Sequence, residues 1–180
     1  MTIFLCGFMG CGKSTMGRAL ARRLRLPLID TDDYIVEQEG MSIPEIFAQK
    51  GEPYFRKTEA DAVRTLCRKS AVISCGGGTM LNPDTAAAAR EEGTVVLIDQ
   101  SFEVCYERIK DDENRPLVQK NTKEQLREIY NTRAEIYRAH ASLVLKAEST
   151  PDATAQRLIE MMKIPMPTDA VAASSVQEKA

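Results

Sequence analysis

The residues from Gly7 to Thr15 read Gly-Phe-Met-Gly-Cys-Gly-Lys-Ser-Thr, a pattern suited to phosphate binding. Two glycines separated by four residues, then Lys and Ser, form a loop whose backbone N–H groups surround phosphate oxygens. In such a loop Lys13 reaches the outer phosphates of a nucleotide, and the Ser14 hydroxyl binds Mg²⁺. The sequence therefore predicts a nucleotide-phosphate site that comprises Gly10, Cys11, Gly12, Lys13, Ser14 and Thr15.

The segments on either side of this loop agree with that prediction. Residues 2–6 are a short apolar run that predicts a buried strand. A helix is predicted over residues 13–25, where apolar side chains recur on one face at positions 16, 19, 20 and 24. A strand, a glycine loop and a helix N-terminus together direct N–H groups at an anion. The alternative is a glycine-rich turn beside a chance Lys-Ser pair, which does not account for these flanks.

Two acidic residues follow the second predicted strand, residues 26–29. A crossover helix separates this strand from the first, so we expect the two to be parallel and to end at one edge of the sheet. Asp30 and Asp32 are two residues apart and should point to one side of the strand end. One can hold a Mg²⁺-bound water while the other accepts a proton from an acceptor hydroxyl. The alternative is a helix N-cap cluster, a role that we assign to Asp33.

The triplet Gly76-Gly77-Gly78 follows the third predicted strand, residues 71–75. Three glycines cost backbone entropy, so a loop that contains them usually needs close approach or positive φ. Exposed N–H groups here can meet an anionic or hydroxylated acceptor. A plain tight turn is the alternative.

Three arginines are candidate ligands for anionic groups. Arg56 and Arg133 lie in predicted helical segments, and each alone is better interpreted as a surface charge. Arg115 lies in the polar stretch 111–121, which predicts a mobile loop, and can close over a transferring phosphoryl group. Phosphoryl transfer needs a phosphate cradle, Mg²⁺, a group that orients the acceptor, and cations, and the sequence supplies each of them.

Strands and helices alternate along the chain, which predicts an α/β fold with a parallel sheet covered by helices on both faces. The five predicted strands are residues 2–6, 26–29, 71–75, 95–98 and 142–146. Residues 1–163 form one predicted domain, and residues 164–180, rich in Pro, Ala, Ser and Thr, predict a disordered tail.

Composition narrows the class of protein. With 24 basic and 26 acidic residues the net charge is −2, which argues against a nucleic-acid or membrane-surface role. No apolar run is long enough for a signal peptide or a membrane span. The five cysteines form no C-x-x-C pair and predict free thiols in a reducing cytoplasm. Cys11 is better interpreted as a small filler of the loop than as a reactive thiol.

These motifs, in this order, resemble the shikimate kinases, which belong to the nucleoside-monophosphate-kinase-like branch of P-loop proteins. The resemblance covers most of residues 1–163. It depends on the phosphate loop, Asp30-Thr31-Asp32, Phe55-Arg56 with Glu59, the glycine triplet, Arg115-Pro116-Leu117, and Arg133 with Tyr137.

The resemblance implies ATP-dependent phosphorylation of the 3-hydroxyl of shikimate, a step in aromatic amino-acid biosynthesis. It also implies a P-loop fold with a five-stranded parallel sheet, a substrate-binding subdomain at about residues 32–60 and a mobile lid at about 111–122. Mg²⁺ is the expected cofactor and ATP the co-substrate. We expect a monomer with no nucleic-acid or membrane partner.

The same resemblance suggests roles for single residues. Asp32 would hold the acceptor hydroxyl and act as base, while Ser14 binds Mg²⁺ directly and Asp30 does so through water. Lys13 and Arg115 would serve the transferring phosphate, and Arg108 would lie on the adenine side.

The acceptor carboxylate would be held by two arginines. Arg56 and Arg133 would grip it beside Gly76, Gly77 and Gly78, and Glu59 would keep Arg56 in place. Guanidinium groups match planar carboxylates, which supports this role independently. The sequence departs from the family in the loop 147–151, which lacks the Arg that often lies against adenine.

Two alternatives remain at this point. A related small-metabolite kinase, such as a gluconate kinase, would share the phosphate loop but would not need two arginines that converge on a carboxylate. A regulatory module that senses ATP would show no turnover that depends on an acceptor.

Overall fold

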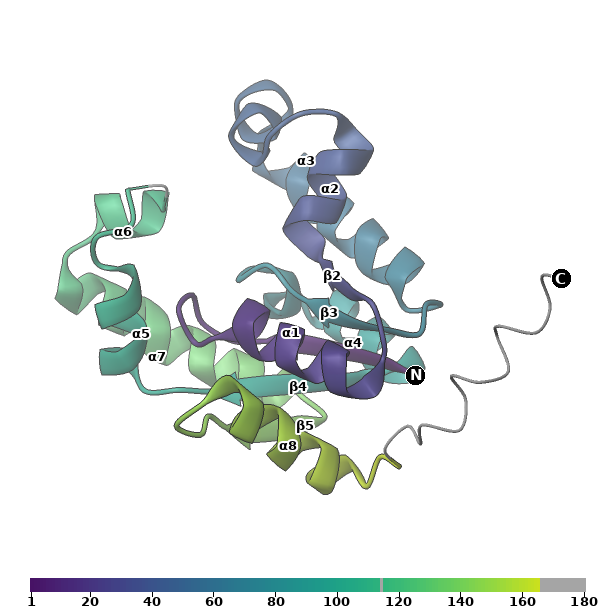
Figure 1. The fold of residues 1–180 in the computed structure, drawn as a ribbon. Coiled ribbons are helices and arrows are strands. Elements are labelled where there is room, and N and C mark those ends of the chain that lie inside the picture. The colour runs from purple at the N-terminus through teal and green to yellow at the C-terminus, as the bar shows by residue number, and fades with distance from the viewer. Residues whose placement is uncertain (114, 166–180) are drawn as a thin grey trace, which may run out of the picture.

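The sheet confirms the predicted fold class. A computed structural model of the chain describes residues 1–113 and 115–165. A five-stranded sheet in the order β2-β3-β1-β4-β5 lies between layers of helices, and every pairing in it is parallel (Figure 1). The strands are β1 (Thr2–Cys6), β2 (Leu28–Asp30), β3 (Ala71–Ser74), β4 (Thr94–Asp99) and β5 (Leu143–Lys146).

The helices begin where the sequence offers capping groups. Ser42 and Thr122 form capping boxes with Glu45 and Gln125, and Asn82, Ser101 and Thr150 each cap a helix with a side-chain oxygen. The α-helices are α1 (Lys13–Leu24), α2 (Thr31–Glu39), α3 (Ile43–Leu66), α4 (Pro83–Glu92), α5 (Phe102–Ile109), α6 (Pro116–Lys120), α7 (Lys123–His140) and α8 (Pro151–Met162), and η1 (Thr79–Leu81) is a short 3-10 helix.

The central strand β1 is buried on both faces because its side chains alternate between two cores. Ile3 and Leu5 pack with residues of α1 and α8, whereas Phe4 packs with residues of α3, α4 and α7. Figure 1 shows α1 and α8 on one side of the sheet and α4 and α7 on the other. The sheet is thus a rigid support for the loops at its edge.

The topology places three loops together. Strands β2 and β3 lie on one side of β1 within the sheet, and β4 and β5 lie on the other. The strand order therefore switches direction at β1. Ligands of open parallel sheets bind at the carboxyl ends of strands beside such a point. The segments after β1, β2 and β3 all begin at this edge.

Helices α2 and α3 project beyond the sheet and carry a small core of their own (Figure 1). That core comprises Ile35, Ile46, Phe55 and Ala62. Gly51, with φ 81° and ψ 168°, interrupts α3.

Two sequence predictions need correction in their bounds. The second strand is residues 28–30 and not 26–29; it begins after Pro27, which has no N–H for a ladder. The stretch 111–121 was predicted to be an irregular loop, but Pro116–Lys120 forms α6, because Pro fits the first turn of a helix and Val118 is buried. The predicted tail was residues 164–180; Ile164 packs against the core beside α8, and residues 166–180 lie outside the described part of the chain.

Candidate active site

The phosphate loop connects β1 to α1 at the sheet edge. Gly12 is the N-cap of α1 with φ 104°, a backbone conformation that residues other than glycine rarely adopt. The ammonium of Lys13 donates to the carbonyl oxygens of Gly7 at 2.8 Å and Phe8 at 3.1 Å. Lys13 thus lies across its own loop, where phosphate oxygens would compete for the same ammonium.

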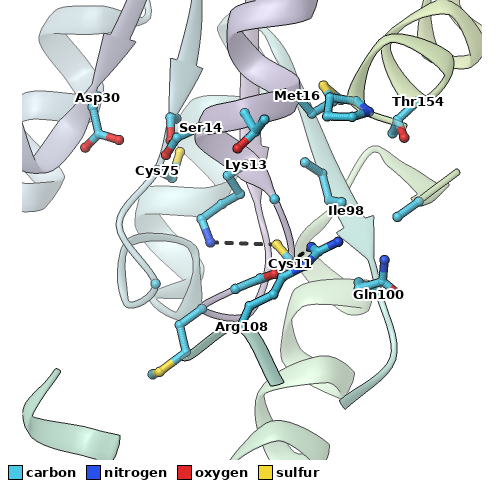
Figure 2. A pocket seen from close by; sticks show the side chains of 18 of the residues that line it. Cys11, Lys13, Ser14, Met16, Asp30, Cys75, Ile98, Gln100, Arg108 and Thr154 are labelled. Atoms are coloured by element: carbon cyan, nitrogen blue, oxygen red, sulfur yellow. Dashed lines mark hydrogen bonds between the residues drawn. The ribbon is translucent and has the colours of Figure 1, made fainter. Parts of the chain in front are cut away.

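A cavity of about 600 Å³ opens over this loop. Figure 2 shows Lys13, Ser14 and Asp30 on one side of it and Arg108 and Gln100 on the other. Of the predicted site residues it contains Gly10, Cys11, Gly12, Lys13, Ser14, Thr15, Asp30, Asp32, Gly76, Gly77, Arg108 and Arg115. The wall does not include Arg56, Gly78 or Arg133 among the described residues.

The geometry of the two aspartates differs from the prediction. Strand β2 ends at Asp30 and α2 begins at Thr31, so Asp32 lies in the first turn of a helix and not on a strand. Asp30 is the N-cap, since its Oδ1 accepts from the Asp32 backbone N–H at 3.0 Å. The assignment of the cap to Asp33 was therefore wrong, although both Asp30 and Asp32 still line the cavity.

Asp32 has the properties of a proton acceptor. Burial, together with the charges of Asp30 and Glu59, raises the pKa of its carboxyl to about 6, although the ammonium of Lys13 opposes the shift. A carboxyl with a pKa near the operating pH is ionised at neutral pH and still basic enough to accept a proton.

Oxygen ligands suited to a hard cation lie beside the phosphate loop. The Ser14 hydroxyl is 3.4 Å from the hydroxyl of Ser74, and the Asp30 carboxylate lines the same cavity. Mg²⁺ in kinases is held by one or two carboxylates together with substrate phosphates, and this set of donors fits that pattern. Ser74 was not predicted as a site residue from the sequence. Its position near the end of a predicted strand, just before the glycine triplet, is the signal that could have identified it.

The glycine triplet is the surface on which the predicted acceptor residues meet. A Cβ atom on Gly76 would collide with the carboxylate of Asp32, and one on Gly78 would collide with the Arg56 guanidinium. A Cβ on Gly77 would lie 3.9 Å from Arg133 Nη1. Gly76 and Gly78 therefore allow close approach, and the triplet lies against side chains from α2, α3 and α7.

Arg56 is held by two carboxylates. Its Nη1 donates to Glu59 Oε2 at 2.6 Å, as the resemblance implies, and Glu59 is almost fully buried. Its Nε and Nη2 donate to the exposed Glu52 at 3.2 and 3.0 Å. The second partner of Glu59 is the buried hydroxyl of Thr79 at 2.9 Å, which no local sequence pattern indicates.

Arg133 and Tyr137 approach the triplet from α7. The Tyr137 hydroxyl donates to the carbonyl oxygen of Gly77. Burial raises the pKa of Tyr137 above the usual range, so it remains a neutral donor. These two residues lie one helical turn apart, and therefore on one face of α7.

Arg115 is the N-cap residue of α6 and lines the cavity. Its Nε donates to Asp112 Oδ2 at 2.7 Å. Arg108 donates from Nη1 to the Gly10 carbonyl oxygen at 2.9 Å, which ties α5 to the phosphate loop.

The loop after β5 forms the remaining wall of the cavity. It contains Ala147, Glu148, Ser149, Thr150 and Pro151, so it contributes no Arg to the adenine side. The backbone N–H of Glu148 donates to Thr154 Oγ1 at 3.0 Å, which fixes this loop to α8.

Comparison with known proteins agrees with this geometry. The family model described as shikimate kinase matches residues 9–163. Shikimate kinase from Aquifex aeolicus is 40% identical over 160 residues, which cover 88% of this chain and 94% of the relative. That from Geobacillus kaustophilus is 38% identical over 167 residues, 89% of this chain and 88% of the relative.

Solved structures give the same result. Shikimate kinase from Acinetobacter baumannii in complex with shikimate superposes with a TM-score of 0.83 at 32% identity, over 90% of this chain and 92% of that one. The structure from Aquifex aeolicus gives 0.80 at 39% identity, over 91% and 96%. These findings favour a shikimate kinase over both alternatives left open by the sequence. The extent of these matches agrees with the presence of the phosphate loop and the glycine triplet. The chain belongs to the shikimate kinase family.

Proposed function

We propose that this enzyme transfers the γ-phosphoryl group of ATP to the 3-hydroxyl of shikimate, in the biosynthesis of aromatic amino acids, with Asp32 as the base. The observation that carries the assignment of residues is the glycine triplet. It places one carboxylate, Asp32, and two guanidinium groups, Arg56 and Arg133, along three consecutive backbone positions. A hydroxylated acid fits that arrangement, with its hydroxyl at the carboxylate and its own carboxylate at the arginines.

The transfer can be written from these residues. Asp32 accepts the proton of the 3-hydroxyl while that oxygen forms a bond to the γ-phosphorus. The bond between the γ-phosphorus and the bridging oxygen breaks, and ADP leaves with that oxygen. The ammonium of Lys13 and the guanidinium of Arg115 stabilise the charge on the phosphates.

A Mg²⁺ ion would be held by Ser14 directly and by Asp30 through water, and it would neutralise phosphate charge when bound. Arg108 and the backbone of residues 10–15 would hold the rest of ATP.

Arg56 has one guanidinium edge that suits the acceptor. The edge formed by Nε and Nη2 bonds the exposed Glu52, and an exposed pair of this spacing contributes about 0.3–0.5 kcal/mol. The acceptor carboxylate would replace Glu52 there, while Glu59 keeps Nη1.

We also assign residues 32–60 to a substrate-binding subdomain, because α2 and the first part of α3 share a separate small core. Residues 111–122 would form the lid.

No helix in the described part of the chain is long and apolar enough to cross a membrane. A cytoplasmic location is supported by five cysteines that are free and buried.

The test compares shikimate with its neutral carboxamide. Wild type should strongly prefer the acid. Arg56→Ala or Arg133→Ala should weaken shikimate binding by about 1.5–3 kcal/mol, roughly ten- to more than a hundredfold, because a charge-assisted pair is lost. The double variant should lose less than the sum of both losses, since the two contacts share one ligand.

The control is Arg64→Ala, which removes an exposed guanidinium of α3 that pairs with Asp61 on its own helix. It should leave affinity for shikimate unchanged, and no variant should alter affinity for ATP. Equal phosphorylation of the acid and the carboxamide by wild type would refute the proposal.

A further inference from the structure

Thr79, the residue after the glycine triplet, is buried and bonded to groups of the site on two sides. Only 2% of its surface is exposed. Its Oγ1 donates to Glu59 Oε1 at 2.9 Å, and its backbone N–H donates to the carbonyl oxygen of Gly76 at 3.2 Å. Thr79 therefore joins the triplet loop to helix α3.

The two oxygens of the Glu59 carboxylate have different partners. Oε1 accepts from Thr79, and Oε2 accepts from Arg56 Nη1 at 2.6 Å. Only 4% of the Glu59 side chain is exposed, so water cannot replace a lost partner at little cost. The orientation of this carboxylate therefore depends on both donors.

The direction of the Arg56 guanidinium depends in turn on Glu59. The same Nη1 that bonds Glu59 is the atom that lies over Gly78. The competing partner, Glu52, has a side chain that is 61% exposed and bonds the opposite edge. If Glu59 were free to rotate, Arg56 could turn toward Glu52 and away from the triplet.

We propose that the hydroxyl of Thr79 is a positioning group for substrate recognition: it fixes Glu59, and Glu59 holds Arg56 over the glycine triplet in the orientation that receives the acceptor carboxylate. This inference rests on the proposed function, since it concerns the same acceptor site. Thr79 does not line the cavity and acts only through Glu59.

The test removes the hydroxyl and keeps the shape. Thr79→Val should raise KM for shikimate about tenfold, because a buried hydrogen bond to a charged group is lost. The kcat and KM for ATP should change less than twofold, since Lys13, Asp32 and the phosphate loop are untouched. Thr79→Ser, which restores the hydroxyl, should return KM to within about twofold of wild type.

A matched control is Thr2→Val. Thr2 is also buried, and its hydroxyl donates to the carbonyl oxygens of Cys67 at 3.1 Å and Lys69 at 2.6 Å at the opposite edge of the sheet. This variant should lose stability without a change in KM for shikimate. Thr79→Ala provides a second variant without added bulk and should show the same rise in KM. An unchanged KM in Thr79→Val and Thr79→Ala, or an equal rise in Thr2→Val, would overturn the inference.

Combination with Arg56→Ala separates this inference from the proposed function. In that background Thr79→Val should add less than twofold to KM, because the residue it positions is gone. A full tenfold effect there would show that Thr79 does not act through Arg56. If Arg56→Ala alone left affinity for shikimate unchanged, the carboxylate site itself would be wrong. If Arg56→Ala weakened binding and Thr79→Val did not, only the role of Thr79 would fail.

Discussion

The Asp32 carboxylate stands in surroundings that favour its neutral form. Burial, followed by the charges of Asp30 and Glu59, raises its pKa from 3.8 to about 6. The folded chain therefore binds a proton more tightly than the unfolded chain between these two pH values. Stability falls as pH rises through this window, and the loss is complete above about pH 6. The proposed base is thus held in the folded protein at a cost in stability.

Asp32→Asn should affect activity and stability in opposite directions. Loss of a general base lowers kcat by about 10²–10⁴-fold. At pH 8 the variant should be more stable than wild type by about 2–3 kcal/mol, because one pK unit corresponds to 1.36 kcal/mol. The gain should fall to about half at pH 5. Urea unfolding at both pH values and a coupled assay of ADP release measure these effects.

Asp33→Asn is the matched control, since Asp33 is the exposed neighbour in the same helical turn. It should leave kcat nearly unchanged and should alter the difference in stability between pH 5 and pH 8 only slightly, because the charge of Asp33 contributes least to the raised pKa of Asp32. A wild-type-like kcat in Asp32→Asn would exclude Asp32 as base, and Asp30 would become the candidate. A stability gain that did not depend on pH would contradict the titration argument.

At the scale of elements, α6 is the short segment between α5 and α7 that places Arg115 on the cavity wall. It is only five residues long, and Val118 is its one buried residue. A helix this short has little stability of its own and depends on its contacts. This segment is therefore the best candidate for movement when substrates bind, and Figure 1 shows that it lies away from the sheet.

If the lid closes on its substrates, Arg115→Ala should lower kcat at least tenfold and leave KM for shikimate nearly unchanged, because Arg115 would contact the phosphoryl group and not the acceptor. Amide hydrogen exchange in residues 115–121 should slow when shikimate and an unreactive ATP analogue are both bound. The control is Lys120→Ala, which removes an exposed cation from the same helix outside the cavity. Equal exchange with and without ligands would mean that this segment is not a lid.

At the scale of the whole molecule, the described surface offers few apolar side chains together. The large apolar residues that are exposed lie on different segments: Met1, Val36, Tyr54, Val104, Val144 and Met161. Stable self-association usually requires a contiguous apolar patch of several hundred Å². The scatter of these residues favours a monomer.

Sedimentation equilibrium at micromolar concentration should therefore give a mass close to 20.0 kDa. Addition of shikimate and an unreactive ATP analogue should leave the mass unchanged, because the proposed site comes from one chain. A mass that doubled with rising protein concentration would contradict the prediction of a monomer.

The sequence by itself determined the features that depend on neighbours along the chain. The phosphate loop could be located because its glycines, Lys13 and Ser14 act together over nine residues. The helix caps Ser42, Thr122 and Thr150 are local in the same way, since each accepts from the backbone N–H three residues along the chain. The five parallel strands followed from the alternation of apolar runs and helical periods.

Only the tertiary structure decided how distant segments meet. No local pattern sets the strand order, or places Asp32, Arg56 and Arg133 along one glycine triplet, because those contacts arise when the faces of α2, α3 and α7 pack. The N-cap of α2 was misassigned to Asp33, since β2 continues to Asp30 and α2 begins directly after it at Thr31, which makes Asp30 the cap. The bond from Thr79 to Glu59 spans 20 residues and is invisible to any local pattern. Packing joins such pairs because a buried carboxylate must find donors wherever the fold places them.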